Sequence, residues 1–262
     1  MRVGILQFSP KFGEKGANFE TIEKYLNGVN ADLIVLPELA LTGYLFLSKK
    51  EVSSLSEDIS GGPSARRFVE IAKRNNLHIV TGFLERDGSK FYNSAILVYP
   101  DGKIKVYRKV HLFFEEKLFF EPGNLGFPVF EVKGVKVGMM VCFDWVFPEA
   151  TRSLALGGAE IIAHPANLVL PYCQDAMITR SIENRVFTIT ANRTGKDVRG
   201  DKELSFTGKS QIVSPSGERV LEFEGEEEGI KVIEIEPAMA RDKNITEYND
   251  LFRDRRPGVY RA

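Results

Sequence analysis

Cysteine and histidine are scarce in this chain of 262 residues. The two cysteines are Cys142 and Cys173, and the three histidines, His78, His111 and His164, are scattered. No CxxC, HExxH or HxH spacing occurs, so the sequence predicts neither a disulfide framework nor a metal site. Free thiols are typical of a reducing compartment, and we expect a cytoplasmic protein without a metal or another cofactor.

The chain also lacks long apolar runs and an excess of charge of one sign. No run approaches the ~20 residues that a membrane-spanning helix needs. The first apolar run ends before Lys11, which is too early for a signal peptide. The formal net charge is -1, so we expect binding neither to nucleic acid nor to a membrane surface.

Several catalytic signatures are missing as well. Without GxGxxG, a Walker loop or GxSxG, the sequence lacks the usual marks of dinucleotide binding, nucleotide binding and serine-dependent α/β hydrolases. Only three glutamines occur, at 7, 174 and 211, and this scarcity favours a thermophilic source.

The order of apolar runs predicts an α/β protein, because short strands alternate with helices. In the first half we expect a βαβ-like opening, a helix that begins at Pro63, and three successive antiparallel strands. The expected strands are 2–8, 31–39, 77–86, 91–100 and 103–112, with the first helix over 18–28. Turn sequences such as Asp87-Gly88 join the antiparallel strands.

The second half continues this pattern. We expect a hairpin around Gly134, helices over 147–158 and 173–184, a buried strand over 159–167, a second hairpin over 209–223 and a last strand over 229–237. No repeat or linker interrupts the chain, so 1–262 is predicted to be a single domain.

Cys142 follows an apolar strand and precedes a proline that can open a helix. A strand cysteine is more often inert core. At a strand end, however, the thiol and the backbone N–H of Phe143 could both face a ligand. A thiol with an ordinary pKa of about 8.5 then needs a base or a cation to become a nucleophile.

Candidate partners for this thiol are a carboxylate, a lysine or a histidine. Glu38 lies among apolar residues that would raise its pKa into the range of a general base, although it could instead be a surface carboxylate. Lys109 shares a strand face with Tyr107 and His111, yet strand lysines are commonly solvated. Spacing alone does not choose among Glu115, Glu116 and Glu121, and a papain-type base at His111 or His164 stays open.

Three segments in this order resemble the motifs of the nitrilase superfamily: LPELALTGY, YRKVHLF and VCFDWVFPE. The resemblance implies Glu38 as general base, Lys109 as stabiliser of the tetrahedral intermediate and Cys142 as nucleophile. It also implies that Glu116 positions Lys109 or substrate, and that the Phe143 N–H holds the oxyanion. The implied fold is a four-layer α-β-β-α sandwich that dimerises into eight layers.

The same resemblance implies a small-molecule substrate and hydrolysis through a thioester. We expect amide hydrolysis, with nitrile or N-carbamoyl amine hydrolysis as alternatives, and a non-catalytic interaction module as an alternative of another class. Tyr44, Phe114, Trp145 and Asn167 are candidate pocket walls, although each could be core. The tail over 250–262, with Arg253, Arg255, Arg256 and Arg261, is expected to dock on a second subunit.

Overall fold

Two six-stranded sheets lie face to face in the computed structural model, which describes residues 1–260. The first sheet has the order β14-β1-β2-β3-β4-β5 and the second β13-β12-β9-β8-β7-β6. The first comprises β1 (Arg2–Gln7), β2 (Leu33–Val35), β3 (His78–Asp87), β4 (Lys90–Val98), β5 (Ile104–Arg108) and β14 (Gly229–Glu234). The second comprises β6 (Val129–Val132), β7 (Val135–Met139), β8 (Ile161–Pro165), β9 (Phe187–Ala191), β12 (Gln211–Val213) and β13 (Arg219–Glu222).

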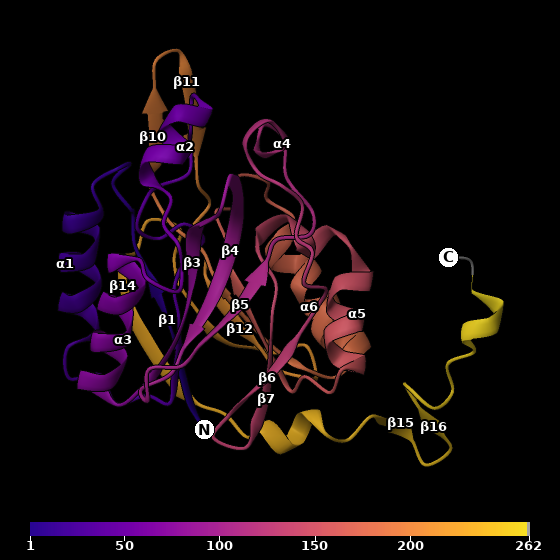
Figure 1. Cartoon of the computed structure of the whole chain (residues 1–262). Helices are drawn as coiled ribbons and strands as arrows, with labels where there is room; N and C mark the ends of the chain where they lie inside the picture. The colour runs from indigo at the N-terminus through magenta and orange to yellow at the C-terminus, as the bar shows by residue number, and fades with distance from the viewer. Residues whose placement is uncertain (261–262) are drawn as a thin grey trace.

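Helices cover the outer faces of both sheets (Figure 1). α1 (Lys15–Leu26) and α3 (Pro63–Asn75) lie against the first sheet, and α5 (Pro148–Leu156) and α6 (Cys173–Asn184) against the second. The predicted α/β class and the four-layer sandwich are thereby confirmed. Dimerisation into eight layers stays a prediction.

Strand alternation explains the layers. In β1, Val3 and Ile5 belong to the core between the sheets, whereas Leu6 belongs to the core under α1 and α3. The central strands of each sheet are parallel and buried on both faces, which accounts for their nearly continuous apolar sequences. Burial of these side chains is the main source of stability.

Several predicted boundaries were wrong. The strand expected over 31–39 ends at Val35, and the chain then turns, with Leu39 at φ 48°. The strand expected over 103–112 ends at Arg108. Several elements were not predicted, among them the helices α2 (Lys49–Leu55) and α4 (Glu116–Phe119) and the hairpin of β10 (Lys196–Arg199) and β11 (Lys202–Ser205).

The last segment leaves the body of the molecule (Figure 1). It contains the 3-10 helix η2 (Pro237–Ala240), the short hairpin β15 (Asn244–Thr246) and β16 (Asn249–Asp250), and the 3-10 helix η3 (Pro257–Val259). Several of its large side chains are exposed, Tyr248 by 81%, whereas Ala240 is buried and Phe252 packs against the core between the sheets. Arg261, part of the predicted docking tail, lies outside the described residues. Within 1–260, no helix combines the length and the apolar character that crossing a bilayer requires.

Candidate active site

The candidate residues follow the carboxyl ends of strands. Glu38 comes shortly after β2, Lys109 directly after β5, Cys142 after β7 and Asn167 after β8. β5 is antiparallel to β4, which is antiparallel to β3, so β5 runs in the same direction as β2 and β3. Ligand sites of α/β proteins form at such strand ends, and here both sheets contribute to one site.

Gly82 in β3 fixes the position of Glu38. A Cβ atom at Gly82 would lie 2.1 Å from the backbone N of Leu39 and 2.4 Å from the Cα of Glu38. The Gly82 N–H also donates to the carbonyl of Pro37 over 3.0 Å. The turn that carries Glu38 therefore packs directly on the strand backbone, which only glycine permits.

Lys109 is buried between two carboxylates. Its Nζ donates to Glu38 Oε1 over 2.8 Å and to Glu116 Oε1 over 2.7 Å. Asn93 Nδ2 donates to the same two oxygens, over 2.6 and 3.2 Å. The second oxygen of Glu116 accepts the N–H of Phe113 over 2.8 Å. The second oxygen of Glu38, Oε2, has no hydrogen-bond partner within residues 1–260.

Burial and neighbouring charges shift the pKa values of Glu38 and Lys109 in opposite directions. Desolvation raises the pKa of Glu38 above its ordinary value, although Lys109 opposes the shift. Desolvation alone would lower the pKa of Lys109, but Glu116 and Glu38 outweigh it and raise this pKa. Lys109 therefore keeps its positive charge, while Glu38 accepts a proton more readily than an exposed glutamate.

Cys142 occupies a strained backbone position. It begins the 3-10 helix η1 (Cys142–Val146) with φ 42°, in the left-handed region that non-glycine residues rarely adopt. Its Sγ lies 3.7 Å from the carbonyl oxygen of Asn167. Burial first, and the charge of Glu38 second, raise the pKa of the thiol well above its ordinary value. The resting side chain is therefore a neutral thiol.

Asp144 joins the Cys142 turn to the segment of Lys109. Its Oδ2 accepts the Tyr107 hydroxyl over 2.7 Å and the Val141 N–H over 2.8 Å. Its Oδ1 accepts the backbone N–H of His111 over 3.1 Å and the ring Nδ1–H of His111 over 2.8 Å. One buried carboxylate thus satisfies four donors and holds two chain segments together.

The histidines are engaged elsewhere. His164 Nε2 donates to the carbonyl of Cys142 over 2.9 Å, and its Nδ1 lies 3.1 Å from the Thr190 hydroxyl. Desolvation lowers the pKa of His164 to about 4, so the ring stays neutral. His111 is bound to Asp144. Among the described residues, neither ring forms a hydrogen bond with the Cys142 thiol, which disfavours the papain-type alternative.

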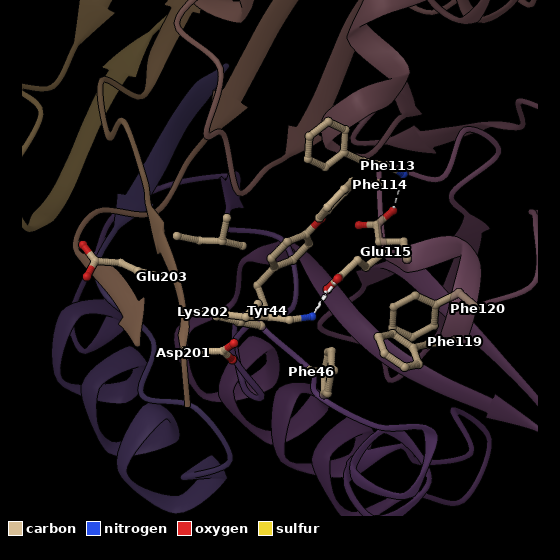
Figure 2. A pocket seen from close by; sticks show the side chains of 13 residues that line it. Tyr44, Phe46, Phe113, Phe114, Glu115, Phe119, Phe120, Asp201, Lys202 and Glu203 are labelled. Carbon is tan, nitrogen blue, oxygen red and sulfur yellow. Dashed lines mark hydrogen bonds and ion pairs between the residues drawn. The ribbon is translucent and has the colours of Figure 1, made fainter. Parts of the chain in front are cut away.

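A cavity of about 360 Å³ opens beside Glu116 (Figure 2). Six of its thirteen lining residues are aromatic, among them Tyr44 and Phe114. Glu115 pairs with Lys202 over 2.6 Å at this cavity, whereas Glu116 accepts a hydrogen bond from the buried Lys109. Glu121 is exposed. Of the three glutamates that spacing left open, Glu116 is therefore the one that contacts Lys109.

A second, much narrower cleft lies at the thiol. Cys142, Trp145 and Asn167 line it together with Phe113 and Phe143, and its volume is about 10 Å³, room for about one water molecule. The four predicted wall residues therefore divide into two pairs, one at each cavity. Phe113 lines both cavities.

Three residues that matter to the site escaped the sequence reasoning: Gly82, Asn93 and Asp144. Asn93 lies in a buried apolar strand, where an amide side chain is unusual, and that contrast could have singled it out. Asp144 lies between the aromatic residues Phe143 and Trp145, and a charged side chain in such an apolar segment is equally unusual. Gly82 carries no signal besides a glycine inside a strand.

A family model described as carbon-nitrogen hydrolase matches residues 2–244. The chain belongs to the carbon-nitrogen hydrolase family. A protein of Pyrococcus abyssi named nitrilase is 45% identical over 263 residues, which cover 99% of each chain. The resemblance to the nitrilase superfamily is confirmed, and the chain is an enzyme of this class.

Solved structures of carbon-nitrogen hydrolases share the fold. The enzyme from Helicobacter pylori G27 superimposes with a TM-score of 0.90 at 26% identity, covering 99% of this chain and 97% of that one. A variant of the amidase from Nesterenkonia sp. AN1 gives 0.81 at 26% identity, covering 99% and 95%. That structure is described as carrying the acetamide moiety of fluoroacetamide on its active site cysteine.

Proposed function

We propose that this carbon-nitrogen hydrolase cleaves a small non-peptide amide to an acid and ammonia through a thioester on Cys142. The observation that carries the proposal is the cluster of Lys109 with Glu38 and Glu116, buried at the strand ends that also carry the thiol. Within it, Glu38 keeps one unpartnered oxygen that can take a proton. The acetamide moiety attached to the active site cysteine of the Nesterenkonia amidase supports the choice of nucleophile.

The first half of the reaction forms the thioester. Glu38 takes the proton of the neutral Cys142 thiol as Sγ attacks the amide carbon. Lys109 stays charged and, with the Phe143 N–H, stabilises the developing oxyanion. The carbon–nitrogen bond then breaks, and ammonia leaves with the proton that Glu38 held.

Water completes the cycle. Glu38 deprotonates a water molecule, which attacks the thioester carbon, and Lys109 again stabilises the negative oxygen. The C–S bond breaks and Cys142 regains a proton from Glu38. Glu116 and Asn93 hold Lys109 and Glu38 in position, and no cofactor is needed.

Substitution of the thiol tests the reaction. We expect Cys142→Ser and Cys142→Ala to abolish ammonia release from short aliphatic amides, whereas Cys173→Ser retains it. Unchanged turnover in Cys142→Ser would refute the mechanism. Dicarboxylic monoamides, N-carbamoyl amines and dinitriles belong in the same screen, and turnover of dinitriles without amides would favour the nitrilase alternative, as the name of the Pyrococcus relative suggests.

The interaction-module alternative is tested by thiol reactivity. Both cysteines are buried, but only Cys142 has a base and a cation beside it, so iodoacetamide should label Cys142 faster than Cys173. Equal labelling rates together with no turnover in the screen would favour a binding role. We also propose that the enzyme is a homodimer and that the segment after Asp250 contacts the second subunit.

A further inference from the structure

Buried polar atoms without a partner are concentrated at the candidate site. Within residues 1–260 six such side-chain atoms occur, and four belong to Glu38, Asn93 and Asn167. Buried polar groups are normally hydrogen-bonded, so each exception needs an explanation. Asn167 is unusual because both Oδ1 and Nδ2 are unpartnered.

Neighbouring asparagines show that the fold can satisfy such a side chain. Asn192 Oδ1 accepts the Leu168 N–H over 2.8 Å, and its Nδ2 donates to Gly208 O over 2.6 Å and to the Thr207 hydroxyl over 3.0 Å. Asn192 therefore has a structural role. The Asn167 side chain forms no such bond, although the residue is only 3% exposed.

The backbone holds Asn167 at the thiol. Its carbonyl oxygen lies 3.7 Å from Cys142 Sγ. The flanking N–H groups are fixed, that of Ala166 by the carbonyl of Ala191 over 2.9 Å and that of Leu168 by Asn192. Asn167 lines the narrow cleft with Cys142 and Trp145. A buried donor and a buried acceptor without partners thus belong to a residue that lines the cleft at the thiol.

We infer that the Asn167 side chain binds the reacting group of the substrate and makes the site selective for carboxamides over nitriles. A primary amide offers an acceptor oxygen and a donor NH2 in one plane, which pair with Nδ2–H and Oδ1 of Asn167. This pairing holds for either orientation of the Asn167 amide, because each presents one donor and one acceptor. A nitrile has only an acceptor and leaves Oδ1 unpaired.

The inference rests on the proposed function and deepens it by naming the residue that selects amides over nitriles. Sites built to pair a substrate N–H or O–H reject analogues that lack it by large factors, because a buried polar group is left unpaired. Asn167 thereby differs from Lys109, which stabilises negative charge in the reaction of either class of substrate.

The test compares isobutyramide with isobutyronitrile, which share one carbon skeleton. Asn167→Leu should lower kcat/KM for the amide by about 100-fold, the loss seen for single site donors, and lower the amide-to-nitrile ratio at least about tenfold. Asn167→Ala, which cannot clash, should act in the same direction. Asn184→Leu is the matched control, because Asn184 is also buried with an unpartnered oxygen but lies at the end of α6.

Binding gives a second readout that does not depend on turnover. In a Cys142→Ala background, we expect a titration followed by NMR to show that Asn167→Leu weakens the binding of isobutyramide. The binding of isobutyronitrile should be unchanged or tighter. Equal loss for both compounds, or no loss for either, would overturn the role of Asn167. Failure of the proposed function itself is distinguishable, because Cys142→Ala alone would then retain activity.

Discussion

The Tyr107 hydroxyl lies 2.7 Å from Asp144 Oδ2, so the residue two positions before Lys109 is bound to the residue two positions after Cys142. The same oxygen accepts the N–H of Val141, immediately before Cys142. The distance between the thiol and the ammonium is thereby controlled by a carboxylate that need not touch the substrate.

Asp144→Asn should therefore impair catalysis without changing any proposed catalytic group. An amide has one acceptor oxygen and brings an NH2 group against existing donors, so the Cys142 turn loses its fixed position. We expect kcat to fall about 100-fold, in keeping with the sensitivity of reaction rates to small misplacements, and alkylation of Cys142 to slow. Tyr107→Phe removes only one of the four donors to Asp144, together with the acceptor of the Val110 N–H, and should have a smaller effect. An unchanged alkylation rate in Asp144→Asn would contradict this role.

Glu38→Gln should abolish turnover and raise the stability of the folded chain. The pKa of Glu38 is raised in the folded chain, chiefly by burial. A buried carboxyl group with a raised pKa lowers the free energy of unfolding once it is ionised. A neutral glutamine at position 38 avoids this loss at neutral pH. We expect loss of turnover and a Tm about 2–4 °C higher, as for a gain of about 1 kcal/mol. Glu121→Gln, at an exposed position, is the control, and a lower Tm in Glu38→Gln would count against the raised pKa.

The pH profile should report the same carboxyl group. As the pH falls, Glu38 takes a proton and loses its function as a base, so kcat/KM declines on the acid side with a midpoint above the ordinary value of 4.5. Burial raises this pKa, whereas the hydrogen bond from Asn93 lowers it. Asn93→Leu should therefore move the acid midpoint to higher pH. A midpoint that moves to lower pH would show that another group titrates.

Gly82→Ala tests the support under Glu38. The added methyl group would meet the backbone of Glu38 and Leu39 at distances that no side chain rotation can relieve. We expect a loss of several kcal/mol or of the folded state at elevated temperature, as overpacking of a core typically costs about 1–3 kcal/mol, and a large fall in kcat in any folded fraction. Gly16→Ala, in α1 with open space around it, should be neutral or stabilising.

Truncation tests the C-terminal segment. Removal of the residues after Asp250 should convert the proposed dimer to a monomer in sedimentation, because exposed apolar side chains such as Val259 and Tyr260 would lose their contacts with the second subunit. A truncated chain that remains dimeric would refute docking by this segment.

Strand and helix order could be read from the sequence because alternating and helical spacing of apolar residues directly reflects burial. Pro63 opens α3, and the helix at Cys173 ends at Asn184 as expected. Strand ends were misjudged where backbone contacts decide the path. The chain turns after Val35 because the Glu38 turn packs on Gly82, a contact between residues 44 positions apart that no local pattern reveals.

The candidate site could be predicted only in part from the sequence, for the same reason. Motif order led to Glu38, Lys109 and Cys142, and the structure brings Glu116 into contact with Lys109. Asn93 and Asp144 have no fixed spacing to these residues, and their importance arises from hydrogen bonds between segments that are distant in sequence.

Lys109 faces two carboxylates, so the ionised cluster carries one negative charge in excess. A neutral amide enters such a site without electrostatic cost, whereas the carboxylate that hydrolysis produces is repelled as soon as it is ionised. In the proposed reaction, the charges that activate the Cys142 thiol would therefore also repel the product, and the acid should be a poor inhibitor.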